Sequence, residues 1–181
     1  MRMGKIRKPN RLRAHDYSTE GAYFITICSK GREPVFGRVV VGPSIARLPE
    51  VCLSPEGKAV EAAILGISSH YPTVQVEQFV IMPNHIHLLL RLEKPESRAM
   101  HGPTVAVVIQ QMKGYASKLA GRSLWQLRYY DHVVRDGQDY DRIVEYVNKK
   151  AAELNLNGAL DKNKSTDNSR LIMALAAIGK N

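Results

Sequence analysis

A short turn between two strand-like runs constrains the fold of this chain more than any other feature of its sequence. Residues 74–81 and 85–92 are rich in β-branched and other apolar residues, and the pair Pro83-Asn84 lies between them. Proline followed by asparagine is typical of a turn, and a turn this short joins antiparallel strands. We therefore expect the two runs to pair as neighbouring strands of a sheet.

The second of these runs opens with two histidines, His85 and His87, separated by one hydrophobic residue. Alternate side chains of a strand project from the same face, so both imidazoles would point the same way. Neutral imidazole is the commonest protein ligand for metals. The spacing alone also occurs by chance, but its place directly after the turn predicts a metal site at the start of a buried strand.

The rest of the chain alternates between strand and helix patterns. We expect strands over residues 23–28 and 35–41, an extended segment over 125–134, and helices over 54–69 (cap Ser54), over 104–120 (cap Thr104) and from Asp136 or Asp139 onward. This order predicts an α+β fold, an antiparallel sheet with helices packed on one face.

The length of 181 residues fits one domain. We expect a basic N-terminal arm over residues 1–15, a folded domain over 16–158 and a C-terminal tail over 159–181. Cys28 and Cys52 lack CxxC spacing, and no secretion signal or membrane-spanning run is visible in the sequence. These features predict a cytoplasmic protein with reduced thiols and no membrane partner.

The net charge of +9 points to a polyanionic partner. Residues 1–13 and 97–130 form two basic tracts without a single Asp or Glu, as suits a phosphate backbone. A soluble basic protein without such a partner is the alternative explanation. The residues that we expect to contact DNA are Arg7, Lys8, Arg11, Arg13, Lys113, Lys118 and Arg122.

The third expected helix carries a tyrosine away from its apolar stripe. Tyr146 lies roughly 120° from the centre of that stripe, at about 100° per residue, with Lys150 and Glu153 on its own side. The stripe comprises Tyr140, Ile143, Val144, Val147, Ala151 and Leu154. A tyrosine that merely packs on the helix flank is the ordinary explanation; beside a metal-bound phosphate the same phenol could act as a nucleophile.

The run Met82-Pro83-Asn84-His85-Ile86-His87-Leu88 resembles the metal-binding motif of the HUH single-tyrosine transposases. These small insertion-sequence transposases include the REP-associated tyrosine transposases. Residues 17–26, 125–136 and 140–147 resemble further segments of the family in the same order, so that the similarity covers about residues 8–157.

The resemblance implies a ferredoxin-like α+β fold and cleavage of single-stranded DNA. His85 and His87 would hold a divalent ion, Mg²⁺ or Mn²⁺, and Tyr146 would attack phosphorus to leave a 5′-phosphotyrosine. The family usually has Asn or Gln four residues after the tyrosine, whereas this chain has Lys150, whose ammonium cannot ligate a metal. Either Glu153 or a water replaces that ligand, or metal affinity and activity are reduced.

Three functions follow as hypotheses. The first is a transposase or endonuclease acting on single-stranded or hairpin DNA, as a monomer or a homodimer. The second is a weakened or domesticated relative that binds hairpin DNA without cutting it. The third is an unrelated metal hydrolase that uses His85 and His87 on a small molecule.

Overall fold

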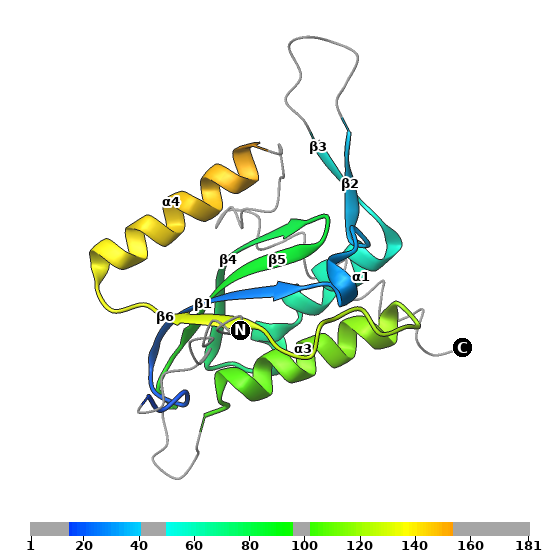
Figure 1. Ribbon diagram of the computed structural model, residues 1–181. Helices are drawn as coiled ribbons and strands as arrows, with labels where there is room; N and C mark the ends of the chain where they lie inside the picture. Colours follow the sequence, from blue (N-terminus) through cyan, green and yellow to red (C-terminus); the bar gives the residue numbers. More distant parts are fainter. Residues whose placement is uncertain (1–14, 41–49, 96–101, 154–181) are drawn as a thin grey trace, which may run out of the picture.

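The computed structural model describes residues 15–40, 50–95 and 102–153. A four-stranded sheet, in the order β4-β5-β1-β6, lies at its centre, and every neighbouring pair is antiparallel (Figure 1). Its strands are β1 (Gly21–Cys28), β4 (Val74–Met82), β5 (His85–Leu92) and β6 (Tyr130–Val133). A separate two-stranded sheet pairs β2 (Gly37–Val40) with β3 (Glu50–Leu53).

The helices lie on both sides of the sheet (Figure 1). They are α1 (Pro55–Leu65), α2 (Ile67–His70), α3 (Val105–Leu119) and α4 (Gly137–Glu153). The α+β class and the ferredoxin-like order of strands are confirmed. Helices α1 and α3 share one face as expected, but α4 covers the opposite face, which differs from the one-sided arrangement expected from the sequence.

The difference arises because strand β5 is buried on both faces along most of its length. Ile86, Leu88 and Leu90 join the large core under α1 and α3. Leu89 faces the other way and joins a smaller core with Ile143 and Val147 of α4. A strand buried on both sides requires a cover on both sides, and α4 supplies the second one.

Local signals explain where the helices begin. The side chain of Ser54 accepts a hydrogen bond from the Gly57 amide at 3.0 Å, and Thr104 accepts one from the Val107 amide at 3.3 Å, so both expected caps are confirmed. The single helix expected over 54–69 is divided at Gly66 into α1 and α2. Within the expected extended segment 125–134, only β6 is regular strand.

The turn before His85 is held from two sides. The Phe36 amide donates to the Pro83 carbonyl, and the Ser29 amide donates to the Asn84 carbonyl, both at 2.9 Å. Because Phe36 and Ser29 are fully buried, these bonds are shielded from water. The turn therefore delivers His85 onto β5 from a fixed backbone.

The proposed arm and tail lie outside the described residues, apart from His15, so the division into three parts remains a prediction. Cys28 and Cys52 are free thiols. Among the residues that the structure describes, no helix has the length and apolar character needed to cross a membrane.

Replacing two glycines in helices by alanine is expected to change the free energy of unfolding in opposite directions. A Cβ on Gly57 would lie 1.9 Å from the backbone oxygen of Phe36, whereas a Cβ on Gly114 of α3 would meet nothing within 4 Å. Alanine is favoured over glycine in a helix by about 1 kcal/mol. We expect Gly114→Ala to raise the free energy of unfolding by about 0.5–1 kcal/mol, and Gly57→Ala to lower it by about 1–3 kcal/mol because the backbones must separate. Urea denaturation measures both, and a stabilised Gly57→Ala variant would contradict this packing.

Candidate active site

The face of the sheet under α4 brings together the three residues expected to form a site. His85 and His87 project from the same side of β5, with their ring centroids 4.9 Å apart. From α4, the Tyr146 hydroxyl oxygen reaches to 3.3 Å from Nε2 of His87. Two residues that are 59 positions apart in the sequence therefore meet at one point.

His87 is fixed on three sides. Thr26, its partner in the β1–β5 register, places Oγ1 2.9 Å from Nδ1 of His87. The Phe24 ring stacks on the imidazole at 5.3 Å between centroids, and the edge of Tyr146 closes the third side. Only 5% of His87 is exposed, so its orientation is set by these neighbours.

The tautomer of His85 follows from its own hydrogen bond. Its Nδ1 lies 2.7 Å from Oδ1 of Asn84, and an amide oxygen only accepts. Nδ1 therefore carries the proton, which leaves the lone pair on Nε2. A histidine held in this way by a second residue is arranged as a metal ligand. The Thr26 hydroxyl allows the same tautomer for His87, since it can accept from Nδ1.

The environment keeps both imidazoles neutral. Burial lowers the pKa of His87 to about 4, and the charges of His85 and Lys150 act in the same direction. Burial also lowers the pKa of His85, with smaller contributions from Arg32 and Lys150. Since metals bind the neutral imidazole, both side chains are ready to ligate at neutral pH.

Two neutral imidazoles fit a divalent ion as two of its ligands, but the described residues do not complete the set. Within them, no group of three His, Cys, Asp or Glu side chains could hold a metal. Glu153 is the last residue of α4, and its side chain lies outside what the structure describes. Lys150 places Nζ 6.0 Å from the centroid of the Tyr146 ring.

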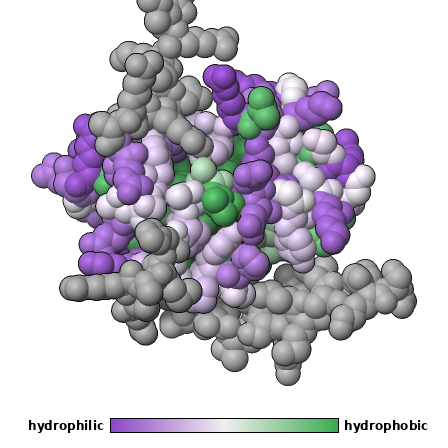
Figure 2. Space-filling model, turned by 90° about the horizontal axis from the view of Figure 1, so that it is seen from below, coloured by the Kyte–Doolittle hydropathy of each residue, from purple (hydrophilic) through white to green (hydrophobic). Residues whose placement is uncertain are grey.

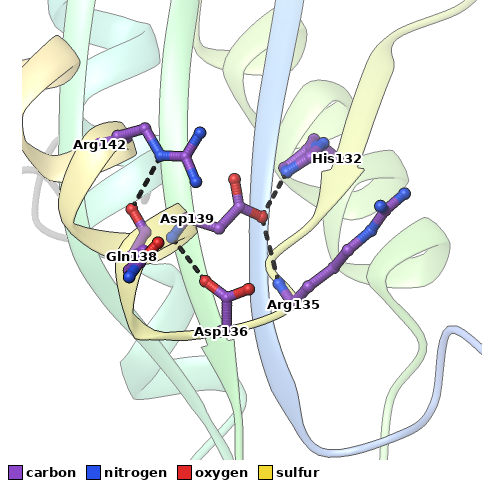
Figure 3. A network of polar contacts seen from close by, with 6 residues as sticks. All are labelled: His132, Arg135, Asp136, Gln138, Asp139 and Arg142. Carbon is purple, nitrogen blue, oxygen red and sulfur yellow. Dashed lines mark hydrogen bonds and ion pairs between the residues drawn. The ribbon is translucent and has the colours of Figure 1, made fainter.

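A polar network fixes the start of α4 (Figure 3). It thereby fixes where along the sheet the helix places Tyr146. Asp136 precedes the helix and accepts a hydrogen bond from the Asp139 amide at 2.8 Å, so Asp136 is the cap. The Asp139 carboxylate contacts His132 Nε2 at 2.8 Å and accepts from the Arg135 amide at 3.2 Å. These contacts, led by the one to His132, lower the pKa of Asp139 and tie β6 to α4.

The buried stripe of α4 agrees with the helical spacing. Ile143, Val147 and Ala151 are buried, Tyr140 and Val144 are partly buried, and Leu154 lies outside the described residues. Tyr146 is 42% exposed, so its hydroxyl can be reached from solvent while its ring touches the histidine face.

Sequence reasoning missed Phe24, Thr26 and the hydrogen-bonding role of Asn84. The strand that carries Phe24 and Thr26 was expected, but its register with β5 was not. With Thr26 opposite His87, the same alternation would have identified it as a partner of the imidazole.

The described basic residues lie elsewhere. Lys113, Lys118 and Arg122 belong to α3 and the loop after it, on the other side of the sheet from the histidines. Lys113 donates to the carbonyl oxygens of Gln126 at 2.7 Å and Leu127 at 3.3 Å, and burial lowers its pKa.

Arg122 pairs with Glu56 at 2.8 Å, whereas Lys118 is exposed. On this side of the molecule, hydrophilic side chains surround a small hydrophobic area (Figure 2). The structure does not bring these basic residues to the histidines, and their contact with DNA remains a prediction. Arg7, Lys8, Arg11 and Arg13 lie outside the described residues.

Two known proteins are similar to this chain in sequence. An "Uncharacterized protein" of Haemophilus influenzae is 29% identical over 161 residues, which cover 78% of this chain and 86% of that protein. A second Haemophilus influenzae protein, named "Putative REP-associated tyrosine transposase", is 23% identical over 143 residues, which cover 73% and 70%.

A solved REP-associated tyrosine transposase, bound to a REP hairpin, has a similar structure. The TM-score is 0.56 at 17% sequence identity, and the match covers 81% of this chain and 76% of that one, which supports the fold. The family model "Transposase IS200 like" matches residues 19–150. Because this match spans most of the chain and includes both histidines and the tyrosine, the protein belongs to the family of IS200-like transposases.

Proposed function

We propose that this protein cleaves and rejoins single-stranded DNA through a covalent bond to Tyr146. The observation that carries the proposal is the 3.3 Å approach of the Tyr146 hydroxyl oxygen to Nε2 of His87. This contact brings the phenol of Tyr146, the proposed nucleophile, beside two neutral imidazoles on a solvent-accessible face. Such a geometry supports a tyrosine-dependent strand transferase.

In the proposed reaction, the Tyr146 oxygen forms a bond to phosphorus, and the bond from phosphorus to the 3′ oxygen breaks. The phenolic proton passes to solvent, and the departing 3′ oxygen takes up a proton from water. The products are a 5′-phosphotyrosine and a free 3′-hydroxyl. One phosphodiester replaces another, so a 3′-hydroxyl can later reverse the step and rejoin strands without an external energy source.

His85 and His87 would hold a divalent ion, Mg²⁺ or Mn²⁺, through Nε2. Such an ion supplies a Lewis acid that polarises the phosphate and positions its oxygens. The chain's own contribution is orientation: Asn84 fixes the tautomer of His85, and Thr26 aims His87. Glu153 remains a candidate for a further ligand, as does water.

Hairpin DNA is the proposed substrate. The solved relative is bound to a REP hairpin, and the net charge of +9 suits a phosphate backbone. Family membership leaves a small-molecule metal hydrolase without support. A protein that binds hairpin DNA without cutting it remains the second candidate, because Lys150 brings a positive charge to the place where a metal would bind.

Replacing the nucleophile separates these two candidates. We expect Tyr146→Phe to abolish the covalent protein–DNA adduct formed with hairpin DNA and Mn²⁺, by about a thousandfold or more, because the attacking oxygen is gone. Denaturing gel electrophoresis of labelled DNA measures the adduct.

Tyr140→Phe is the matched control, since Tyr140 lies on the same helix but packs beneath the Arg91 guanidinium instead. It should form the adduct as the wild type does. Hairpin binding without any adduct in the wild-type protein would support the second candidate and refute cleavage.

The low pKa of His87 predicts how metal binding responds to acid. Protons compete with the metal only when the pH approaches the pKa of a ligand. With that pKa at about 4 instead of the ordinary 6.5, Mn²⁺ affinity should stay nearly constant between about pH 8 and pH 6 and fall only below about pH 5. Calorimetric titration across this range tests the expectation, and a midpoint near pH 6.5 would contradict the lowered pKa of both histidines.

A further inference from the structure

Two cationic residues flank the histidine pair. Lys150 lies one helical turn after Tyr146 on α4, half-buried, with Nζ 6.0 Å from the centre of the tyrosine ring. Arg32 belongs to the turn after β1, and the Asn84 side-chain amide donates to its carbonyl oxygen at 3.3 Å. Since Asn84 also bonds His85, the backbone of Arg32 is connected to the site through the side chain of Asn84.

The backbone of Arg32 is unusual. Its φ of 59° lies in the left-handed region that favours glycine, and within the described residues no other non-glycine residue has a positive φ. Its amide donates to the Ser29 carbonyl at 3.0 Å, and its own carbonyl is held by Asn84, so the conformation is stabilised from both sides. Backbone strain that is maintained in this way concentrates at functional sites.

The ammonium of Lys150 opposes a metal ion that binds alone. Its Nζ lies 6.0 Å from the centre of the Tyr146 ring, and the hydroxyl oxygen of that tyrosine lies 3.3 Å from Nε2 of His87. Like charges repel at this range, so Lys150 disfavours a divalent cation on the imidazoles. A phosphate placed among them reverses the balance, because its negative oxygens attract the ion and both cationic side chains.

We propose that Lys150 is a catalytic residue that binds a non-bridging oxygen of the scissile phosphate, with Arg32 as a second cation, so that the divalent ion and DNA bind cooperatively. This inference rests on the proposed function. Negative charge grows on the non-bridging oxygens as the tyrosine attacks, and a positioned ammonium stabilises that charge. In this arrangement the site takes up its metal together with its substrate.

Direct metal binding tests the coupling without relying on turnover. The Mn²⁺ dissociation constant is measured by electron paramagnetic resonance in a Tyr146→Phe background, so that no DNA is cut. Each protein is measured alone and with a DNA hairpin carrying a single-stranded flank, and binding to the DNA alone is subtracted. Three substitutions are compared: Lys150→Gln, Lys150→Arg and the neighbouring Lys149→Gln, which removes the same charge from an exposed position.

We expect the hairpin to tighten Mn²⁺ binding by about tenfold or more in the parent protein, within the usual range of coupling between two sites. Lys150→Gln should bind Mn²⁺ more tightly than the parent without DNA, and its gain on adding DNA should fall to about threefold or less. Lys150→Arg and Lys149→Gln should behave like the parent.

Equal behaviour of Lys150→Gln and Lys149→Gln would overturn the role of Lys150 while leaving metal binding by the histidines intact. Mn²⁺ binding that is unchanged by His85→Ala and His87→Ala would instead overturn the proposed function, and this inference with it. Absence of any DNA-dependent gain in the parent protein would refute the cooperative binding.

Discussion

The burial of β5 on both faces is the constraint on which the rest of the structure depends. One face of this strand builds the large core with α1 and α3, and the other builds the smaller core with α4. The histidines lie on the second face, so the packing that holds α4 also holds Tyr146 against His87. The burial of this one strand on both sides therefore determines both how the helices pack and where the candidate site forms.

Burial also sets the chemistry of the site. Removing His87 from water keeps its imidazole neutral, which suits a ligand, and the contacts of Thr26 and Phe24 leave it one orientation. An exposed histidine pair would have the same sequence spacing but neither property. The spacing of His85 and His87 therefore marks where the site is, while its surroundings determine what the pair can do.

Much of the fold could be predicted from local patterns. The hairpin over 74–92, the caps Ser54 and Thr104 and the buried stripe of α4 all depend on residues near one another in the sequence. The face covered by α4 could not be predicted, because one face of β5 mixes Leu89 with His85, His87 and Arg91, and this pattern does not show that a helix covers it. Thr26 was missed because strand register is set by tertiary structure. Asn84 was missed although it precedes His85 directly, because the direction of its side chain is not given by the sequence.

The candidate site is divided between β5 and α4, so its geometry depends on how these two elements pack against each other. The distance between Tyr146 and His87 is set by the side chains between α4 and the sheet, among them Ala22, Leu89 and Val147. A bulkier residue at Ala22 would push α4 away from the sheet without replacing His87 or Tyr146 and without entering the core under α1 and α3. A substitution at Ala22 would therefore leave a folded chain whose Tyr146 lies too far from His87 for the proposed cleavage.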